Sequence, residues 1–325
     1  MRLKPLLSLL CLSALALSTQ ALGAQDVVRL GNLKFAHYGA VSYMKELAPK
    51  YHLKIDERMF AKGIDINPAI VAGEIDASAA ALDAAIAGRA AGVPIYVVAG
   101  FARGGARLVV RPDAGIKSLK DLKGKKVGVA RGGAQEVLLL AELAKAGLTW
   151  ADKPGKDVLV LYLPFADLNQ TLMAKNIDAM CQSEPYSSQA IHRGFGVELL
   201  KPYDTPIGEP IRALVITEKL YKERRDVARR FLLCFVEATK KFIDEPKTAE
   251  KFVREVMFKN QISAEDYQDA IGNSPFSYDI SLQHVQITTD LMLKYGVGKM
   301  TNPPKAGDWV KLDLLTEAKK QLKVK

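Results

Sequence analysis

The chain has 325 residues, of which 49% are hydrophobic, so it is long enough to form two compact lobes with separate cores. Its 46 lysine and arginine residues exceed its 36 acidic ones and give a formal net charge of +10, but the positive residues are spread along the chain. That spread argues against a nucleic-acid-binding block, and three cysteines are too few for a disulfide framework.

Residues 1–24 have the pattern of a secretory signal peptide. A basic tip precedes an apolar run from residue 6 to residue 17, and small residues follow. The run is shorter than the ~20 apolar residues that span a bilayer, and the small residues suit a cleavage site. We predict a cleaved leader and an exported mature protein that begins at Ala24 or Gln25. The leucine before Cys11 is too large for a lipidation site, so no lipid anchor is expected.

Apolar runs and helical patterns alternate between residues 27 and 100. Strands are predicted at 27–30, 53–59, 75–79 and 95–100, and helices at 39–51, 65–72 and 82–91. Alternation at this spacing is typical of a parallel sheet covered by helices on both faces. We therefore predict an α/β fold with a doubly wound sheet.

Residues 118–148 combine a short helix, a turn at Gly124, a strand at 127–130, a glycine pair and an amphipathic helix that ends at Gly147. A strand that ends on Gly132 and Gly133 at the start of a helix leaves backbone N–H groups free. The positive end of the helix then favours an anion or a carbonyl oxygen. The same turn also occurs for purely geometric reasons, and neither GxGxxG nor GxxxxGK[ST] is present, so no nucleotide is indicated.

The rest of the chain continues the pattern and then becomes mainly helical. Another apolar run covers 106–111, and an irregular segment follows it. The segment TPIGEP at 205–210 interrupts the order of elements before a strand at 212–220, and an amphipathic helix is predicted at 224–246, where a proline ends it.

Four segments resemble the solute-binding proteins of ABC importers, in the branch that takes nitrate, sulfonates, taurine, bicarbonate and thiamine precursors. The segments are SLKDLKGKKVGVARGGAQ at 118–135, VAGEIDASAAALDAAIAGRAAGVPIYVVAG at 71–100, LMAKNIDAMCQSEPY at 172–186 and RALVITEKL at 212–220. The resemblance implies a two-lobed type II periplasmic-binding fold, with a mostly parallel sheet flanked by helices in each lobe. It places lobe 1 at 25–111 plus 207–325 and lobe 2 at 112–206.

Ligands of open parallel sheets bind beyond the carboxyl ends of the strands, so candidate site residues are those that follow each strand. The predicted ligand-binding residues are Phe35, His37, Tyr38, Phe60, Ala81, Asp83, Phe101, Arg103, Arg131, Gly132, Gly133, Ala134, Glu184 and Tyr186. They come from both lobes, as a closing cleft requires. The aromatic residues among them suit an apolar pocket for an organic ligand and suit a core equally well.

Arg103 and Arg131 are the predicted anion ligands, because a guanidinium binds a carboxylate or sulfonate through two parallel hydrogen bonds. Each is also compatible with a surface position or with an ion pair to Glu184. Glu184 itself suits either a ligand contact or a bridge between the lobes. The many alanines and glycines near these positions leave volume, which favours a bulky organic acid over a bare inorganic anion, although close helix packing has the same signature.

The predicted function is therefore the capture of a small organic anion, a sulfonate or a carboxylate, between two closing lobes. The partners would be this ligand and an ABC permease of the inner membrane, with no nucleic acid, no cofactor and a monomeric chain. Four scattered histidines give no metal-ligand spacing. Two alternatives remain open: a binder of a thiamine-precursor-like pyrimidine, held by Glu184 and Asp83, or an enzyme on the same fold.

Overall fold

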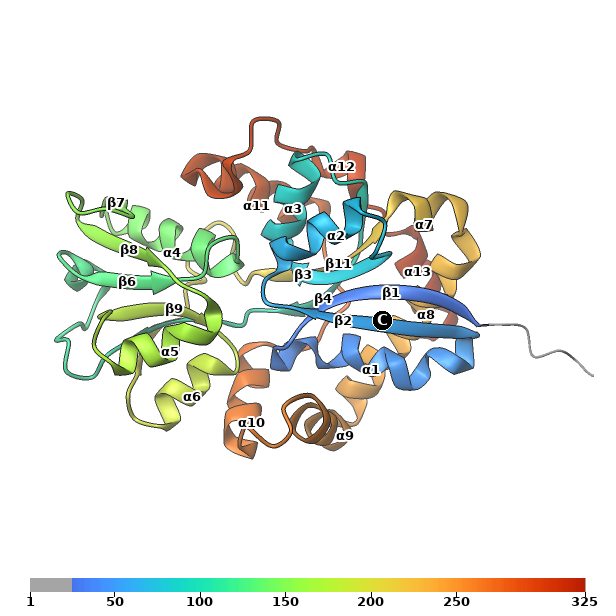
Figure 1. The fold of residues 1–325 in the computed structure, drawn as a ribbon, viewed down its shortest axis with the longest axis horizontal. Helices are drawn as coiled ribbons and strands as arrows, with labels where there is room; N and C mark the ends of the chain where they lie inside the picture. The colour runs from blue at the N-terminus through green and yellow to red at the C-terminus, as the bar shows by residue number, and fades with distance from the viewer. Residues whose placement is uncertain (1–24, 325) are drawn as a thin grey trace, which may run out of the picture.

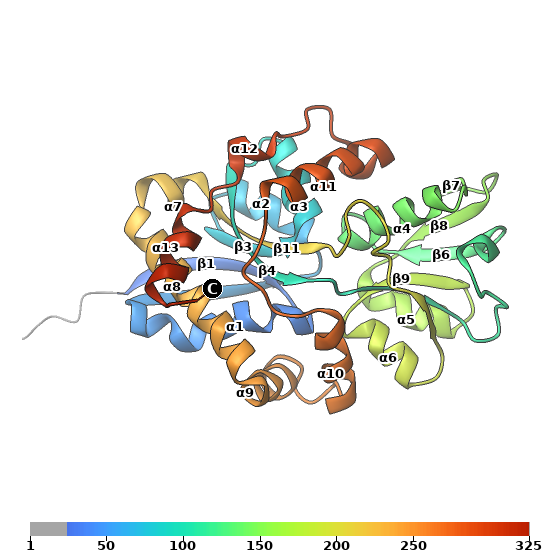
Figure 2. The ribbon, with the colours of Figure 1, turned by 180° about the vertical axis from the view of Figure 1, so that it is seen from behind.

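The structure, a computed structural model, describes residues 25–324 (Figure 1). The predicted signal peptide, residues 1–24, lies outside the described residues. Two sheets stand side by side, and the part of the chain that forms each sheet with its helices is called here the first or the second lobe (Figures 1 and 2). The predicted α/β architecture of two helix-flanked sheets is confirmed.

The first lobe contains a five-stranded sheet in the order β2-β1-β3-β11-β4. Its strands are β1 (Asp26–Leu33), β2 (Leu53–Phe60), β3 (Ala77–Ala81), β4 (Ile95–Arg103) and β11 (Ile211–Thr217). Its helices are α1 (Gly39–Leu47), α2 (Ile66–Val71), α3 (Leu82–Ala90), α7 (Glu218–Glu223), α8 (Arg225–Asp244), α9 (Pro246–Lys251), α10 (Ala264–Asn273), α11 (Leu282–Tyr295), α12 (Ala306–Trp309) and α13 (Asp313–Gln321). Helices α2 and α3 cover one face of this sheet, and α1 and α8 cover the other (Figure 1).

The second lobe contains a six-stranded sheet in the order β10-β5-β9-β6-β8-β7. Its strands are β5 (Ala106–Val110), β6 (Lys126–Val129), β7 (Trp150–Ala151), β8 (Val158–Tyr162), β9 (Ala179–Ser183) and β10 (Val197–Leu200). Its helices are α4 (Ala134–Lys145), α5 (Phe165–Met173) and α6 (Tyr186–His192). The remaining elements are the short 3₁₀ helices η1 (Ala36–Tyr38), η2 (Ala48–Tyr51), η3 (Gly63–Asp65), η4 (Leu119–Leu122) and η6 (Val297–Lys299), and the π-helix η5 (Phe252–Met257).

Each sheet has one strand that runs against its neighbours. In the first sheet β11 is antiparallel to both β3 and β4, and in the second sheet β5 is antiparallel to both β9 and β10. These are the two strands that the chain forms directly after it passes from one lobe to the other. Because they run in reverse, they begin at the edge where the parallel strands end.

The first passage between lobes occurs earlier than the sequence predicted. The predicted boundary places the apolar run at residues 106–111 in lobe 1, whereas residues 106–110 form β5, which pairs with β9 in the second sheet. The chain crosses at Gly104 and Gly105, whose φ angles of +66° and +78° lie in the left-handed region that favours glycine. The second passage follows β10 and reaches β11 through residues 201–210, close to the predicted position.

The apolar periodicity found in the sequence corresponds to real burial. The stripe of α4 packs its leucines into the core, and Gly147 follows the helix with a φ of +73°, as the predicted end of the helix requires. Helix α8 carries the fully buried Phe231 and Phe235 on one side. None of the helices described between residues 25 and 324 is long and apolar enough to cross a membrane.

Candidate functional site

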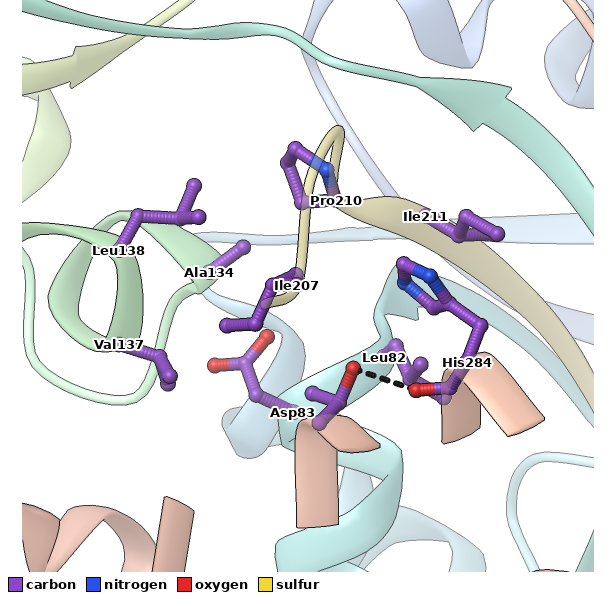
Figure 3. A pocket seen from close by; sticks show the side chains of 10 residues that line it. Leu82, Asp83, Ala134, Val137, Leu138, Ile207, Pro210, Ile211 and His284 are labelled. Atoms are coloured by element: carbon purple, nitrogen blue, oxygen red, sulfur yellow. Dashed lines mark hydrogen bonds between the residues drawn. The ribbon is translucent and has the colours of Figure 1, made fainter. Parts of the chain in front are cut away.

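The carboxyl ends of the parallel strands in both sheets meet at the boundary between the lobes, where two small cavities lie. One cavity, of about 20 Å³, is lined from the first lobe by Leu33, Phe35, Tyr38, Gly63, Ala81 and Arg212, and from the second by Gly132, Gly133, Gln135, Phe165 and Ser183. The other, of about 10 Å³, adjoins Asp83 and Ala134 (Figure 3). This candidate site is therefore lined by residues of both lobes.

Phe35 joins the two lobes in the centre of this boundary. Its ring lies edge-on to Phe165 at a centroid distance of 5.3 Å and to Tyr186 at 5.9 Å, and both of these rings belong to the second lobe. Tyr38 lies 5.6 Å from Phe35 on the first-lobe side and packs on Phe101 at 4.7 Å. The cleft is closed in this structure, and rings fill the volume that the small side chains were predicted to leave open.

Arg212, the second residue of β11, is the one charged residue that lines the larger cavity. It is only 2% exposed. Its Nε–H donates to Nε2 of His37 at 3.2 Å, and its Nη2 donates to the carbonyl oxygen of Gly104 at 3.1 Å. Its Nη1 has no hydrogen-bond partner among residues 25–324. The structure thus holds a guanidinium in place from two sides and leaves one of its nitrogens unpaired.

His37 fixes the orientation of Arg212. The imidazole is fully buried, and this burial, together with the charge of Arg212, lowers the pKa of His37 well below its ordinary value. The ring is therefore neutral at physiological pH, and its Nε2 is free to accept from the guanidinium. His37 was predicted to contact the ligand, whereas in this structure it accepts a hydrogen bond from Arg212 and holds that side chain in place.

The glycine pair lies where the sequence placed it, at the start of α4 beside the cavity. Gly132 has a φ of +73°, and its N–H donates to Oε2 of Glu136 at 2.7 Å, so this amide is already engaged. Gly133 is the N-cap residue, and a Cβ there would come within 3.0 Å of Phe165. In the first turn of α4 the N–H of Glu136 donates to the carbonyl oxygen of Gly133 at 2.9 Å. The N–H groups of Ala134 and Gln135 are the remaining amides of this turn, and Gln135 lines the same cavity as Arg212.

Arg103 and Arg131 lie outside both cavities, which corrects the predicted source of positive charge. The side chain of Arg103 is 51% exposed and lies 3.9 Å from Glu209. That of Arg131 is 50% exposed, stacks over the ring of Tyr162 at 3.7 Å and lies 3.6 Å from Asp152. Arg103 is the last residue of β4 and Arg131 follows β6, but in both the side chain extends outward to solvent.

Glu184 is fully buried and bound on all sides by protein. Its carboxylate lies 2.9 Å from Nε of Arg107, accepts from Oγ of Ser188 at 2.6 Å and accepts from Nδ2 of Asn273 at 2.8 Å. Asn273 belongs to the first lobe and Glu184 to the second. The contacts therefore match the alternative that the sequence left open, a bridge between the lobes.

The remaining predicted residues divide into three groups. Tyr186 touches Phe35, and Ala134 and Asp83 line the smaller cavity. Phe101 is buried beneath Tyr38 and lines neither cavity. Phe60 ends β2 and lies near Gly31, away from both cavities. Among the described residues no group of three His, Cys, Asp or Glu side chains is placed to hold a metal ion.

Sequence reasoning missed Arg212, Gln135 and Phe165. The rule that selected residues after each strand fails for β11, because a strand that runs in reverse presents its first residues at the ligand edge. An arginine at the start of the returning segment RALVITEKL was the signal available for this position. Phe165 follows β8, whose carboxyl end lies at the same edge.

Comparison with known proteins agrees with this architecture. Residues 26–256 match the model of the NMT1-like family. The chain belongs to this family. The putative aliphatic sulfonates-binding protein of Escherichia coli K12 is 30% identical over 194 residues, which cover 58% of this chain and 59% of that protein. The chain thus aligns with about three fifths of the length of this relative.

Solved structures show the same fold at low sequence identity. The nitrate-binding protein NrtA of Synechocystis PCC 6803 has a TM-score of 0.75 at 17% identity, with 93% of this chain and 90% of that chain covered. The alkanesulfonate-binding protein SsuA of Xanthomonas axonopodis pv. citri, bound to MOPS, has a TM-score of 0.74 at 18% identity and covers 88% of this chain and 98% of its own. At such identity the likeness establishes the two-sheet fold.

Proposed function

We propose that the chain is the periplasmic solute-binding protein of an ABC importer and that it captures a small organic anion, a sulfonate or a carboxylate, between its lobes. The family membership and the names of the relatives support the transport role. Membrane delivery would then involve a permease partner, and the predicted leader peptide would direct export to the periplasm.

The unpaired Nη1 of Arg212 is the observation that carries the anionic ligand. Burial of an unpaired charge is costly, so a buried guanidinium with a free nitrogen favours a bound anion. Among residues 25–324 the carboxylate of Asp83 has no hydrogen-bond partner and that of Glu136 accepts from the N–H of Gly132, and neither forms an ion pair within 4.0 Å with Arg212. A ligand carboxylate or sulfonate would satisfy Nη1 and meet the first-turn amides of α4 across the cavity.

The closed cleft implies that the ligand enters an open form. The rings of Phe35 and Phe165 fill the boundary, so a ligand larger than a few atoms requires them to separate. Hinge motion of the two lobes provides this separation. We expect solution scattering to report a more compact particle at saturating ligand than in its absence, and an unchanged radius of gyration would contradict closure.

The pyrimidine alternative has less support. It needs the carboxylates of Glu184 and Asp83 to accept hydrogen bonds from a ligand amine. The carboxylate of Glu184 is already bound by protein side chains. An amine-bearing ligand would also approach the positive charge of Arg212.

A ligand screen followed by arginine variants tests the proposal. The mature protein is screened by thermal shift against alkanesulfonates, aliphatic and aromatic carboxylates, nitrate and pyrimidines. A ligand at a hundred times its Kd adds about 2.7 kcal/mol to stability, enough to raise Tm by several degrees. We expect the sulfonates or carboxylates to stabilise the protein, whereas stabilisation by pyrimidines alone would contradict the anion.

Calorimetry with the best anion then identifies the residue that holds it. Arg212→Gln should weaken binding by about 2 to 5 kcal/mol, the usual effect of removing one partner of a buried charged contact. Arg103→Gln and Arg131→Gln serve as matched controls, because both side chains are exposed, and we expect each to bind as the wild type does. Normal binding by Arg212→Gln, with loss in either control, would restore the arginines that the sequence predicted.

A further inference from the structure

The smaller cavity lies between the lobes and contains a buried carboxyl group without a partner. Its walls come from α3 and α11 of the first lobe, from α4 of the second lobe and from the segment that leads into β11 (Figure 3). Most of the lining is apolar. The carboxyl group of Asp83 points into this space toward Ile207 and the start of α4 (Figure 3). The cavity, of about 10 Å³, holds at most a single water molecule.

Asp83 is 2% exposed, and neither of its carboxylate oxygens has a hydrogen-bond partner among residues 25–324. The titratable and charged groups that interact with it or line its cavity are Glu136 from α4, Arg212 from β11, His284 from α11 and Tyr38 from η1. Nε2 of His284 is also buried without a partner, and burial lowers the pKa of His284, so this ring is neutral. The site therefore contains two unsatisfied polar groups in an apolar contact between lobes.

We propose that Asp83 couples closure of the lobes to the uptake of one proton, so that the closed form carries this carboxyl group in its neutral state. When the lobes separate, α4 withdraws from the cavity and water reaches the carboxyl group, which then ionises. The inference rests on the lobe closure of the proposed function but not on the identity of the ligand.

The direction of the effect follows from burial. In the closed form burial raises the pKa of Asp83 to about 7, and Glu136 adds to the rise, whereas the charge of Arg212 opposes it. In the open, hydrated form a pKa of about 4 is expected. Closure is thus most favoured below about pH 4 and loses this contribution as the pH rises to about 7. Between pH 5 and pH 7 the closure constant should fall about tenfold per pH unit and then level off.

A second titratable side chain, His192, lies in a contact between the lobes. Nδ1 of His192, in the second lobe, lies 2.8 Å from Asp266, and its Nε2 lies 3.6 Å from Asp269, both in the first lobe. The test must therefore separate Asp83 from His192.

The protein contains a natural reporter of closure. Trp150, in β7 of the second lobe, contacts Tyr295 of α11 in the first lobe at a centroid distance of 5.9 Å. The second tryptophan of the chain, Trp309, is fully buried. Acrylamide therefore quenches Trp150 more strongly when the lobes separate, while Trp309 contributes little.

The experiment measures acrylamide quenching of the ligand-free mature protein between pH 5 and pH 8.5 in the wild type and three variants. In the wild type we expect quenching to rise between pH 5 and pH 7 and to level off above. Asp83→Asn should keep the low quenching of the acidic wild type at every pH, because its neutral side chain imitates the protonated acid. His192→Gln and Asp290→Asn, an exposed acid on α11, should retain the wild-type profile.

Circular dichroism checks that each variant is folded, and Asp83→Ser replaces Asp83→Asn if the latter does not fold. A wild-type profile without pH dependence would overturn the proposal. So would pH dependence that persists in the neutral variant at position 83, or that disappears in His192→Gln alone. A ligand screen without hits would count against the proposed anion but leave these quenching profiles interpretable.

Discussion

Arg107 and Arg212 occupy equivalent places in the two lobes but have opposite surroundings. Each is the second residue of the strand that runs against its sheet, and each strand begins directly after a passage between lobes. They are 4% and 2% exposed. Arg107 lies 2.6 Å from Asp269, 2.9 Å from Glu184 and 3.2 Å from Glu198, whereas within residues 25–324 no acidic group lies within 4.0 Å of Arg212.

The difference shows that burial alone does not identify a ligand residue. Arg107 is surrounded by carboxylates from both lobes, so its charge is satisfied by the protein and it joins the lobes together. Arg212 is held by a neutral imidazole and a carbonyl oxygen, which leave its charge uncompensated. Only the second arrangement favours a bound anion, because only there does the anion supply a missing partner.

The largest effect on stability is expected from Arg107→Met. The substitution leaves Glu184 and Asp269 without their cation, and removal of one partner of a buried ion pair costs about 3 to 5 kcal/mol. Urea unfolding of the ligand-free protein measures the loss. Arg103→Met is the control, because its side chain is exposed. A loss below about 1 kcal/mol for Arg107→Met would show that its carboxylates find other partners.

A smaller loss is expected from Glu184→Gln. The amide keeps the shape of the side chain but removes the charge that faces Arg107 and accepts from Ser188 and Asn273. Loss of a buried hydrogen-bonded group costs about 1 to 3 kcal/mol. We expect urea unfolding to show this loss, while affinity for the best anion of the ligand screen stays close to wild type. Binding that disappears with unchanged stability would instead make Glu184 a ligand contact.

The residues show which parts of the site could be predicted from the sequence. Gly132 and Gly133, Phe35 and Tyr38 reach the cavity because local patterns fix the ends of the strands before them. The rule for parallel strands then located one edge of each sheet correctly. Local patterns also placed the helices α1, α3, α4 and α8 within a few residues of their observed bounds.

The sequence patterns did not predict the direction in which a side chain points or the direction in which a strand runs in its sheet. Arg131 follows β6 as predicted, but its guanidinium stacks on Tyr162 because a ring happens to lie beside it in the folded sheet. Arg212 was overlooked because strand order depends on pairing between segments far apart in the sequence, here β11 with β3 and β4. A single sequence does not show which strands pair. It also does not show that acidic side chains contact Arg107 and leave Arg212 without one.

A third effect, close to zero, distinguishes Arg212 from Arg107. Arg212→Met loses two hydrogen bonds, to His37 and to Gly104, but it also removes an unpaired charge from the interior. These contributions oppose each other, so stability in urea should change by about 1 kcal/mol or less. A loss as large as that of Arg107→Met would show that Arg212 has a structural partner and would weaken the case for an anion.

The smallest effect is expected from Arg131→Ala, and it tests whether exposed charge near the cleft matters at all. The guanidinium is half exposed, stacks over Tyr162 and lies 3.6 Å from Asp152. Exposed ion pairs contribute about 0 to 1 kcal/mol, and a cation over an exposed ring contributes a similar amount. Urea unfolding should therefore change by less than about 1 kcal/mol, and affinity for the best anion should not change. If Arg131→Ala nevertheless binds the anion more weakly than the wild type, and this difference shrinks as the ionic strength rises, then Arg131 attracts the anion from a distance. Salt screens such long-range attraction but leaves a buried contact at Arg212 nearly unaffected.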